Sequence, residues 1–205
     1  MNLDVAIIDY KMSNLHSVLS ACKQVGLNSK ITNNRKEILE AKSAILPGVG
    51  AFNEAMGSLK KMQLDKCILD FIDKGKPFIG ICLGMQLLFN NSREFGITKG
   101  LGIISGEVQK LNYKNKKIIT PHVGWNKVKV TNKYKKEFLK FEEKNFYYVH
   151  SFFVSNINDK YTCMHSNYSG IKIPSLVKSK NIVAFQFHPE KSGKTGLKLL
   201  QQVLD

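Results

Sequence analysis

The sequence lacks any run of apolar residues long enough to cross a membrane. Its 205 residues are 43% hydrophobic and 23% charged, and no apolar stretch approaches the roughly 18 residues that a spanning helix needs. The first residues, Met1 to Asp4, lack the basic and then apolar regions of a secretory signal. This composition excludes a collagen, a disordered tail and a small disulfide scaffold. We expect one globular domain, residues 1–205, in a soluble cytoplasmic protein.

Paired cysteines are also missing. The four cysteines stand far apart, with no C-x-x-C pair and no histidine at a metal-ligand spacing. This excludes structural zinc and a disulfide framework, so each cysteine is expected to be a reduced thiol. There is no P-loop and no G-x-G-x-x-G after a strand. We therefore expect neither a metal nor a cofactor.

Acidic residues and arginines are scarce. Lysine and arginine number 31 against 16 acidic residues, a net charge of +15, which could indicate nucleic-acid binding. Only Arg35 and Arg93 are arginines, however, and the other 29 cations are lysines spread along the chain. Because specific recognition of bases and phosphates favours arginine, we expect a lysine-rich surface with no specific nucleic-acid partner.

Short apolar runs alternate with helical patterns in the first half of the chain. Strands are expected at 3–9, 29–32, 43–46 and 77–81, and helices at 15–25, after Asn34, at 52–62, at 64–74 and at 85–90. The first helix would be capped by Ser13 or Asn14. From about residue 101 the pattern changes to short β-like runs at 118–120, 125–131, 146–154, 161–164, 174–178 and 182–187, followed by a helix at 193–204. This order predicts an α/β fold, a mainly parallel central sheet flanked by helices, with antiparallel additions to the same sheet in the C-terminal half.

A candidate nucleophile lies between an expected strand and an expected helix. The segment Gly80-Ile81-Cys82-Leu83-Gly84 matches G-x-nucleophile-x-G. Glycines on either side permit a sharp turn that lifts the thiol above the sheet, and the following helix N-terminus favours the thiolate. A buried structural cysteine is the usual alternative after an apolar strand, but both glycines and the context favour a nucleophile.

A candidate base follows a late strand. His188 comes directly after the apolar run 182–187, and Glu190 lies two residues further on. The carboxylate could orient the imidazole and stabilise its protonated form. Taken alone, His188-Pro189-Glu190 would be a polar turn, but together with Cys82 it predicts a catalytic triad. The amides of Leu83 and of Val49, in the Gly48-Val49-Gly50 turn, are the expected donors of an oxyanion hole.

The chain resembles the class I (triad) glutamine amidotransferases, and among them the glutaminase subunits of imidazole glycerol phosphate synthase. The similarity covers nearly the whole chain and rests on short motifs in a fixed order. The matching segments are Ile7 to Tyr10, Leu46 to Phe52, Gly75 to Phe89, Pro121 to Asn126, Tyr148 to Ser151 and Gln186 to Ser192. The resemblance implies the flavodoxin-like fold of this family.

The resemblance also implies what the site residues do. Cys82 would attack the side-chain amide of L-glutamine, His188 would protonate the departing ammonia, and water would hydrolyse a glutamyl thioester to glutamate. Glutamine recognition is carried onto Gly50, Gln86, Glu94, His150 and Ser151, with Glu94 suited to the substrate's ammonium. Trp125 and Tyr147 match positions near the face where ammonia leaves, although for Trp125 a core aromatic is an equal alternative.

A partner protein is implied as well. In the family the ammonia passes to a (β/α)8-barrel cyclase subunit, a heterodimer partner that forms imidazole glycerol phosphate and AICAR in histidine biosynthesis. Glutaminase output would then depend on the partner's bound nucleotide. After Asp9-Tyr10, however, the family usually has a Gly-x-Gly-Asn turn and Leu-Arg, where this chain reads Lys11-Met12-Ser13-Asn14-Leu15-His16. This difference leaves open a paralogous subunit that supplies ammonia for amidation of a surface-polysaccharide sugar.

Three other hypotheses compete with a glutaminase. A cysteine hydrolase acting on another acyl substrate would share the triad. A basic module binding nucleic acid would not depend on Cys82. An inactive paralogue retained as a scaffold is disfavoured because all three triad positions are intact.

Overall fold

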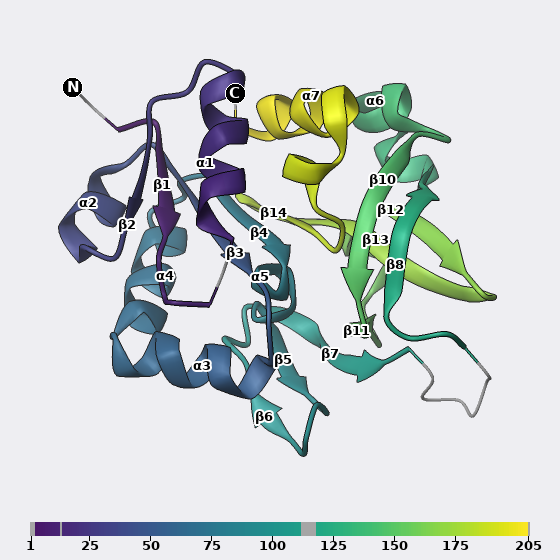
Figure 1. Cartoon of the computed structure of the whole chain (residues 1–205), viewed down its shortest axis with the longest axis horizontal. Helices are drawn as coiled ribbons and strands as arrows, with labels where there is room; N and C mark the ends of the chain where they lie inside the picture. The colour runs from purple at the N-terminus through teal and green to yellow at the C-terminus, as the bar shows by residue number, and fades with distance from the viewer. Residues whose placement is uncertain (1–2, 13, 112–117, 205) are drawn as a thin grey trace.

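The structure, a computed structural model, describes residues 3–12, 14–111 and 118–204. Its main sheet contains the strands β1 (Val5–Ile8), β2 (Ser29–Thr32), β3 (Ser43–Gly48), β4 (Phe78–Cys82), β9 (Lys129–Val130), β12 (Thr162–Tyr168), β13 (Ile171–Ser179) and β14 (Ile182–Phe185). Their order is β2-β1-β3-β4-β14-β13-β12-β9 (Figure 1). The first five strands of this order are parallel, and the last three are antiparallel to their neighbours. The predicted fold class is therefore confirmed.

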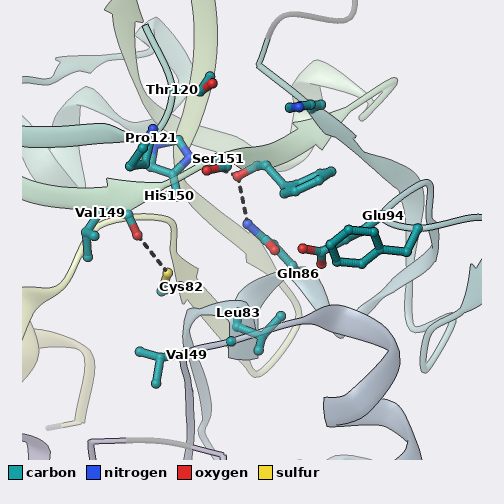
Figure 2. Close-up of a pocket in the computed structure, with 14 residues that line it drawn as sticks. Val49, Cys82, Leu83, Gln86, Glu94, Thr120, Pro121, Val149, His150 and Ser151 are labelled. Carbon is teal, nitrogen blue, oxygen red and sulfur yellow. Dashed lines mark hydrogen bonds between the residues drawn. The ribbon is translucent and has the colours of Figure 1, made fainter.

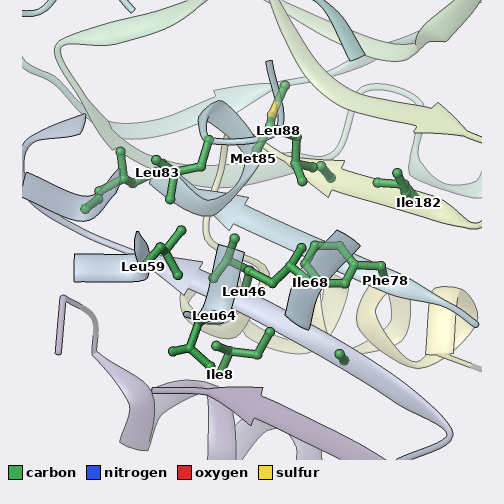
Figure 3. Packing of buried hydrophobic residues seen from close by; sticks show 14 of the residues in the cluster. Ile8, Leu46, Leu59, Leu64, Ile68, Phe78, Leu83, Met85, Leu88 and Ile182 are labelled. Atoms are coloured by element: carbon green, nitrogen blue, oxygen red, sulfur yellow. The ribbon is translucent and has the colours of Figure 1, made fainter. Parts of the chain in front are cut away.

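Helices cover both faces of this sheet because its parallel strands are apolar on both sides. In β1, Ala6 and Ile8 belong to one apolar cluster and Val5 and Ile7 to a second. The first cluster, part of which is drawn in Figure 3, is closed by α2 (Arg35–Glu40), α3 (Phe52–Lys61) and α4 (Leu64–Asp73). The second is closed by α1 (Leu15–Gln24), α6 (Lys135–Phe138) and α7 (Gly193–Leu204). Burial on both faces is typical of parallel sheets.

The helix boundaries largely follow the sequence signals. The Asn34 side chain accepts hydrogen bonds from the amides of Lys36 and Glu37 and so caps α2. Asn14 precedes α1 without a side-chain capping bond, and Ser13 lies outside the described residues. No helix in the described part of the chain is long and apolar enough to span a bilayer.

Three sequence-based predictions were wrong. The helix expected at 85–90 is shorter and starts earlier, as α5 (Leu83–Gln86), because β5 (Phe89–Ser92) follows it almost at once. The later strands were expected in one sheet, but β8 (His122–Lys127) and β10 (Asn145–His150) form a sheet of their own. A further sheet, in the order β11-β7-β5-β6, contains β6 (Thr98–Lys99), β7 (Ile104–Lys110) and β11 (Phe152–Ser155). Residues 118–120 are not a strand.

Candidate active site

Cys82 lies at the carboxyl end of β4, in the sharp turn that leads into α5. Its backbone has φ 54° and ψ −110°, a conformation that strains any residue with a side chain. The neighbouring strand β3 ends beside it, since Gly48 pairs with Cys82. Strain concentrated at one thiol above the sheet is what the elbow motif predicts.

The flanking glycines make this turn possible because backbone passes too close for a side chain. A Cβ on Gly84 would lie 1.8 Å from the Leu46 carbonyl oxygen, and one on Gly80 would lie 2.9 Å from the Gly84 oxygen. Gly48 is equally constrained, since a Cβ there would lie 2.3 Å from the Tyr10 hydroxyl. The elbow thus packs directly against the end of β3.

His188 and Glu190 follow β14, which is the strand next to β4. The His188 Nδ1 is 2.8 Å from Glu190 Oε1, and both side chains are 3% exposed. The His188 backbone amide donates to the Tyr147 carbonyl at 2.9 Å. Because the Nδ1–Oε1 distance is that of a hydrogen bond and a carboxylate can only accept, Nδ1 carries the proton and donates it to Glu190. The other ring nitrogen, Nε2, is buried without a hydrogen-bond partner among the described residues, so it remains free to exchange a proton at the site.

The electrostatics of this pair favour a protonated imidazole. Burial alone would lower the pKa of His188, but the neighbouring Cys82 and the hydrogen-bonded carboxylate of Glu190 outweigh it and raise the pKa to about 10. His188 is thus an imidazolium at neutral pH. A positive ring beside Cys82 stabilises a thiolate and provides a proton for a leaving group.

A cleft of about 520 Å³ opens in front of Cys82 (Figure 2). Of the residues predicted for the site, eight line it: Val49, Gly50, Cys82, Leu83, Gln86, Glu94, His150 and Ser151. Phe95, Lys110, Thr120, Pro121, Val149 and Phe152 complete the lining. His188 and Glu190 instead border a separate narrow space, with Asn14, Pro47 and Lys191. The structure thus places the substrate-binding candidates in the lining of the cleft and the other two triad residues outside that lining.

The two predicted oxyanion donors differ in availability. Leu83 is the first residue of α5, so its amide has no partner within the helix. The Val49 amide donates to the Met12 carbonyl at 3.0 Å and is not free for a ligand. An oxyanion hole with two donors would therefore require the peptide between Gly48 and Val49 to turn.

Gln86 and Glu94 face the cleft with different groups. The Gln86 Nε2 donates to the Phe152 carbonyl at 2.9 Å and to Gln186 Oε1 at 3.1 Å, which leaves the Gln86 oxygen to accept a hydrogen bond from a ligand. Glu94 Oε2 accepts from the Phe52 amide at 2.8 Å. Both side chains thus present oxygens, which suit a ligand with N–H donors.

Both ring nitrogens of His150 are hydrogen-bonded within the protein. Its Nδ1 is 2.8 Å from the Phe152 carbonyl, and its Nε2 is 3.0 Å from His122 Nδ1. Burial lowers the pKa of His150 to about 3 and that of His122 to about 4, so both rings are neutral. We therefore expect that the His150 ring does not bind glutamine, and that in this segment Ser151 and the backbone do.

Two buried residues beside the site were missed by the sequence analysis. Gln186 Oε1 accepts a hydrogen bond from Gln86, and the Gln186 Nε2 lies 3.9 Å from the Cys82 sulfur. His122 stacks between Tyr148 and Tyr168 and holds His150. Gln186 precedes His188 by two residues on the same strand end, a spacing that could have indicated its position. Nothing in the sequence pairs His122 with His150.

The comparisons with known proteins agree with this geometry. The family model "Glutamine amidotransferase class-I" matches residues 6–204. The chain belongs to this family. The amidotransferase is 47% identical to the "Imidazole glycerol phosphate synthase subunit HisH" of Caldanaerobacter subterraneus subsp. tengcongensis, with 96% of this chain and 95% of the relative covered. It is 42% identical to the protein of the same name from Listeria innocua, with 96% and 93% covered.

Solved structures of more distant proteins share the fold of this amidotransferase. A "glutamine amidotransferase" superposes with a TM-score of 0.75 at 15% identity, and 98% of each chain is covered. The "PurLQS from Thermotoga maritima" superposes with a TM-score of 0.73 at 20% identity, covering 100% of this chain and 98% of that one. At these identities the likeness concerns the fold alone.

Lys11 stands where the family usually has the first glycine of a turn, and its backbone has a conformation that glycine favours. Lys11 has φ 70°, a left-handed conformation in which glycine is usual. Its amide and its Nζ both bond the Asp9 carboxylate, at 2.9 and 3.0 Å. In this amidotransferase the turn is thus held by an ion pair at its start.

Trp125 is not a core residue. It is 57% exposed and lies edge-to-face with Tyr147, its cross-strand partner, at 5.9 Å between ring centroids. Val123, two residues before it on β8, is 56% exposed. The amidotransferase therefore carries an apolar strip, Val123, Trp125 and Tyr147, beside the His188–Glu190 segment.

Proposed function

We propose that this chain is the glutaminase subunit of an imidazole glycerol phosphate synthase and hydrolyses L-glutamine to L-glutamate and ammonia. The observation that carries the proposal is the strained Cys82 in a cleft lined by Gln86 and Glu94, together with a buried His188–Glu190 pair whose imidazole pKa Cys82 helps to raise. The relatives from Caldanaerobacter subterraneus and Listeria innocua bear the name of this subunit, and the match covers 95% and 93% of their length. Membership of the amidotransferase family also favours this reading over a hydrolase of another acyl substrate.

The proposed reaction has two stages, the formation of a glutamyl thioester and its hydrolysis, and the triad residues act in both. The Cys82 thiolate attacks the side-chain carbonyl carbon of glutamine, and the carbonyl becomes an oxyanion. The His188 imidazolium gives its Nε2 proton to the departing amide nitrogen, which leaves as ammonia and a glutamyl thioester remains. His188 then takes a proton from water, the hydroxide attacks the thioester, and glutamate leaves Cys82. Glu190 keeps the ring oriented and stabilises its charge throughout.

The oxyanion step is the point at which a partner can control the rate. Leu83 supplies one donor, whereas the Val49 amide is bonded to Met12. Because one such donor is worth roughly 3 kcal/mol of barrier, the chain alone should turn over slowly. We expect partner binding to speed hydrolysis by turning the Val49 amide toward the cleft.

The partner is proposed to be a (β/α)8-barrel cyclase subunit that uses the ammonia to form imidazole glycerol phosphate and AICAR. The strip of exposed Val123 and Trp125 and half-buried Tyr147 supports docking at this face, since aromatic residues are enriched where proteins associate. The strip adjoins the triad, because the Tyr147 amide donates to Ser192 Oγ and its carbonyl accepts from His188. The four cysteines are free thiols. Free thiols are typical of the reducing cytoplasm, where we propose that this chain and its cyclase partner act.

A paralogous subunit for sugar amidation is not favoured. The change at residues 11–16 prompted that alternative, but Lys11 retains the backbone conformation of a glycine. The relatives with up to 47% identity carry the histidine-pathway name. The buried His188–Glu190 pair, whose imidazole pKa responds to Cys82, also disfavours an inactive scaffold.

Glutamate release from glutamine tests the proposal. The purified chain should hydrolyse glutamine weakly alone and much faster with the cyclase subunit and its nucleotide substrate. Cys82→Ala should abolish the reaction under both conditions, whereas Cys67→Ala, which removes a buried thiol from α4, should not. Hydrolysis that survives Cys82→Ala would refute the glutaminase chemistry. Cys82-dependent hydrolysis that the cyclase does not stimulate would refute the assignment of the partner.

A further inference from the structure

Helix α3 begins next to the oxyanion turn but has no cap of its own. Its N-cap residue is Ala51, which has the extended backbone of a cap (φ −85°, ψ 141°) but makes no side-chain capping bond. The first amide of the helix, that of Phe52, donates instead to Glu94 Oε2 at 2.8 Å. A carboxylate from a distant segment therefore caps this helix.

The capped end is continuous with the oxyanion turn. Strand β3 ends at Gly48 and α3 starts at Phe52, so Val49, Gly50 and Ala51 form the whole connection. Gly50 has φ 106°, and its Cα faces the Met12 side chain closely enough that a Cβ would lie 3.0 Å from it. Whatever fixes Phe52 therefore fixes one end of the segment that carries the Val49 amide.

Glu94 is itself held in place. Its amide donates to the Oγ of Ser92 at 3.1 Å, and Ser92 is fully buried at the end of β5. The same region packs on the start of α3, since a Cβ on Gly100 would lie 3.1 Å from the Phe52 ring. Glu94 thus connects the end of β5 with the start of α3, and it lines the cleft (Figure 2).

We propose that Glu94 is a positioning residue for the oxyanion turn, in addition to binding the substrate's ammonium. The inference rests on the proposed glutaminase function, and it adds that substrate recognition and oxyanion stabilisation meet in one carboxylate. Oε2 holds Phe52 and thereby the turn, while Oε1 is left for the ammonium. Loss of Glu94 should then lower kcat through the turn and raise KM through the lost ion pair.

The two roles can be separated by substituting the cap. Ala51→Ser places a hydroxyl at the N-cap of α3, and Glu54 already stands three residues later, which completes a capping box. In a Glu94→Ala background this serine caps the helix through the amide of Glu54 instead of that of Phe52, and so fixes the start of α3 again without restoring a partner for the ammonium. Glu94→Gln is the reciprocal variant, since its amide oxygen can still accept from Phe52 but carries no charge.

The experiment measures kcat and KM of the complex with glutamine and with glutaramate, which lacks the α-amino group. Glu94→Ala should lower kcat about tenfold with both substrates, less than the roughly hundredfold or greater loss from deleting an oxyanion donor. Ala51→Ser in that background should recover part of the lost kcat with both substrates, while KM for glutamine stays high. Ala51→Ser alone should match the unaltered chain. Glu94→Gln should raise KM for glutamine far more than it lowers kcat.

Two results would overturn the inference and leave the glutaminase function intact. One is Cys82-dependent hydrolysis whose kcat for glutaramate is the same with and without Glu94→Ala. The other is a double variant that folds, as judged by its helical circular dichroism, yet recovers none of the lost kcat. Hydrolysis by the unaltered complex that does not depend on Cys82 would instead overturn the proposed function and this inference with it.

Discussion

The charge on His188 is the residue-scale feature on which the chemistry depends. Burial opposes that charge, and it is retained because Glu190 lies 2.8 Å from one ring nitrogen and because Cys82 also raises the pKa of the ring. Since the folded chain holds the proton to a pKa of about 10, the stability gained from the pair is complete below the unfolded value of about 6.5. It is lost as the pH rises through the folded value.

Replacing Glu190 tests this balance. Glu190→Gln removes the charge that helps raise the His188 pKa, so the alkaline limb of the kcat/KM profile should move to lower pH. The rate at neutral pH should fall on the order of 10²- to 10⁴-fold, because the ring loses its orienting carboxylate. The same change at the exposed Glu40, in α2, should leave the profile where it is. An unmoved alkaline limb in Glu190→Gln would contradict the role of this pair.

At this scale the sequence predicted the residues with a local signature. Cys82 has glycines on either side and His188 has a carboxylate two residues away, so short motifs identify them. His122 carries no such signature, and the only local signal of Gln186 is its spacing of two residues before His188. They contribute through hydrogen bonds to Gln86 and His150, which lie 100 and 28 residues away, and long-range side-chain pairs of this kind are not encoded in local spacing.

The elbow is the feature that matters at the scale of elements. Backbone from β3 and α5 meets there with no room for a side chain, so glycine at 84 is a steric requirement. The helix that follows was expected to be longer, because Met85 to Asn90 contains residues typical of helices. It ends at Gln86 because Phe89 pairs with Ile104 in a parallel ladder, and tertiary pairing of this kind overrides local propensity.

Two glycine substitutions test the packing of the elbow. Gly84→Ala would place a Cβ 1.8 Å from the Leu46 oxygen, so we expect a loss of about 3 kcal/mol or more in the free energy of unfolding. Gly57→Ala is the matched control, since no atom lies within 4 Å of its Cβ in α3. Alanine there should stabilise the chain by about 0.5–1 kcal/mol. Urea denaturation that gives equal stability for the two variants would contradict this account.

At the scale of the whole molecule, the sequence predicted the layered sheet better than its edges. The parallel half follows from strands and helices that alternate along the chain. The same alternation does not predict that β10-β8 and β11-β7-β5-β6 form two separate sheets. Strand β7 contains Ser105, Gly106, Glu107 and Gln109 and so lacks an apolar alternation. Which strand pairs with which depends on long-range packing that strand propensity does not report.

The net charge of +15 leads to a prediction about polyanions. Lysines spread over a surface should attract nucleic acid weakly and without sequence preference, so that binding seen at roughly 50 mM salt is lost by about 200 mM. Fluorescence anisotropy with two unrelated duplexes at both salt concentrations measures this, and Cys82→Ala should behave like the unaltered chain. Sequence-dependent binding that persists at the higher salt would indicate a nucleic-acid function that this account lacks.

The most direct test of the central claim is to trap the covalent intermediate. The complex is mixed with glutamine, quenched in acid during turnover and digested, and the peptide containing Cys82 is weighed by mass spectrometry. The account predicts one glutamyl group on Cys82, removed by hydroxylamine as a thioester should be, and none on Cys22, Cys67 or Cys163. Turnover that produces glutamate while Cys82 never carries a glutamyl group, at any quench time, would contradict it.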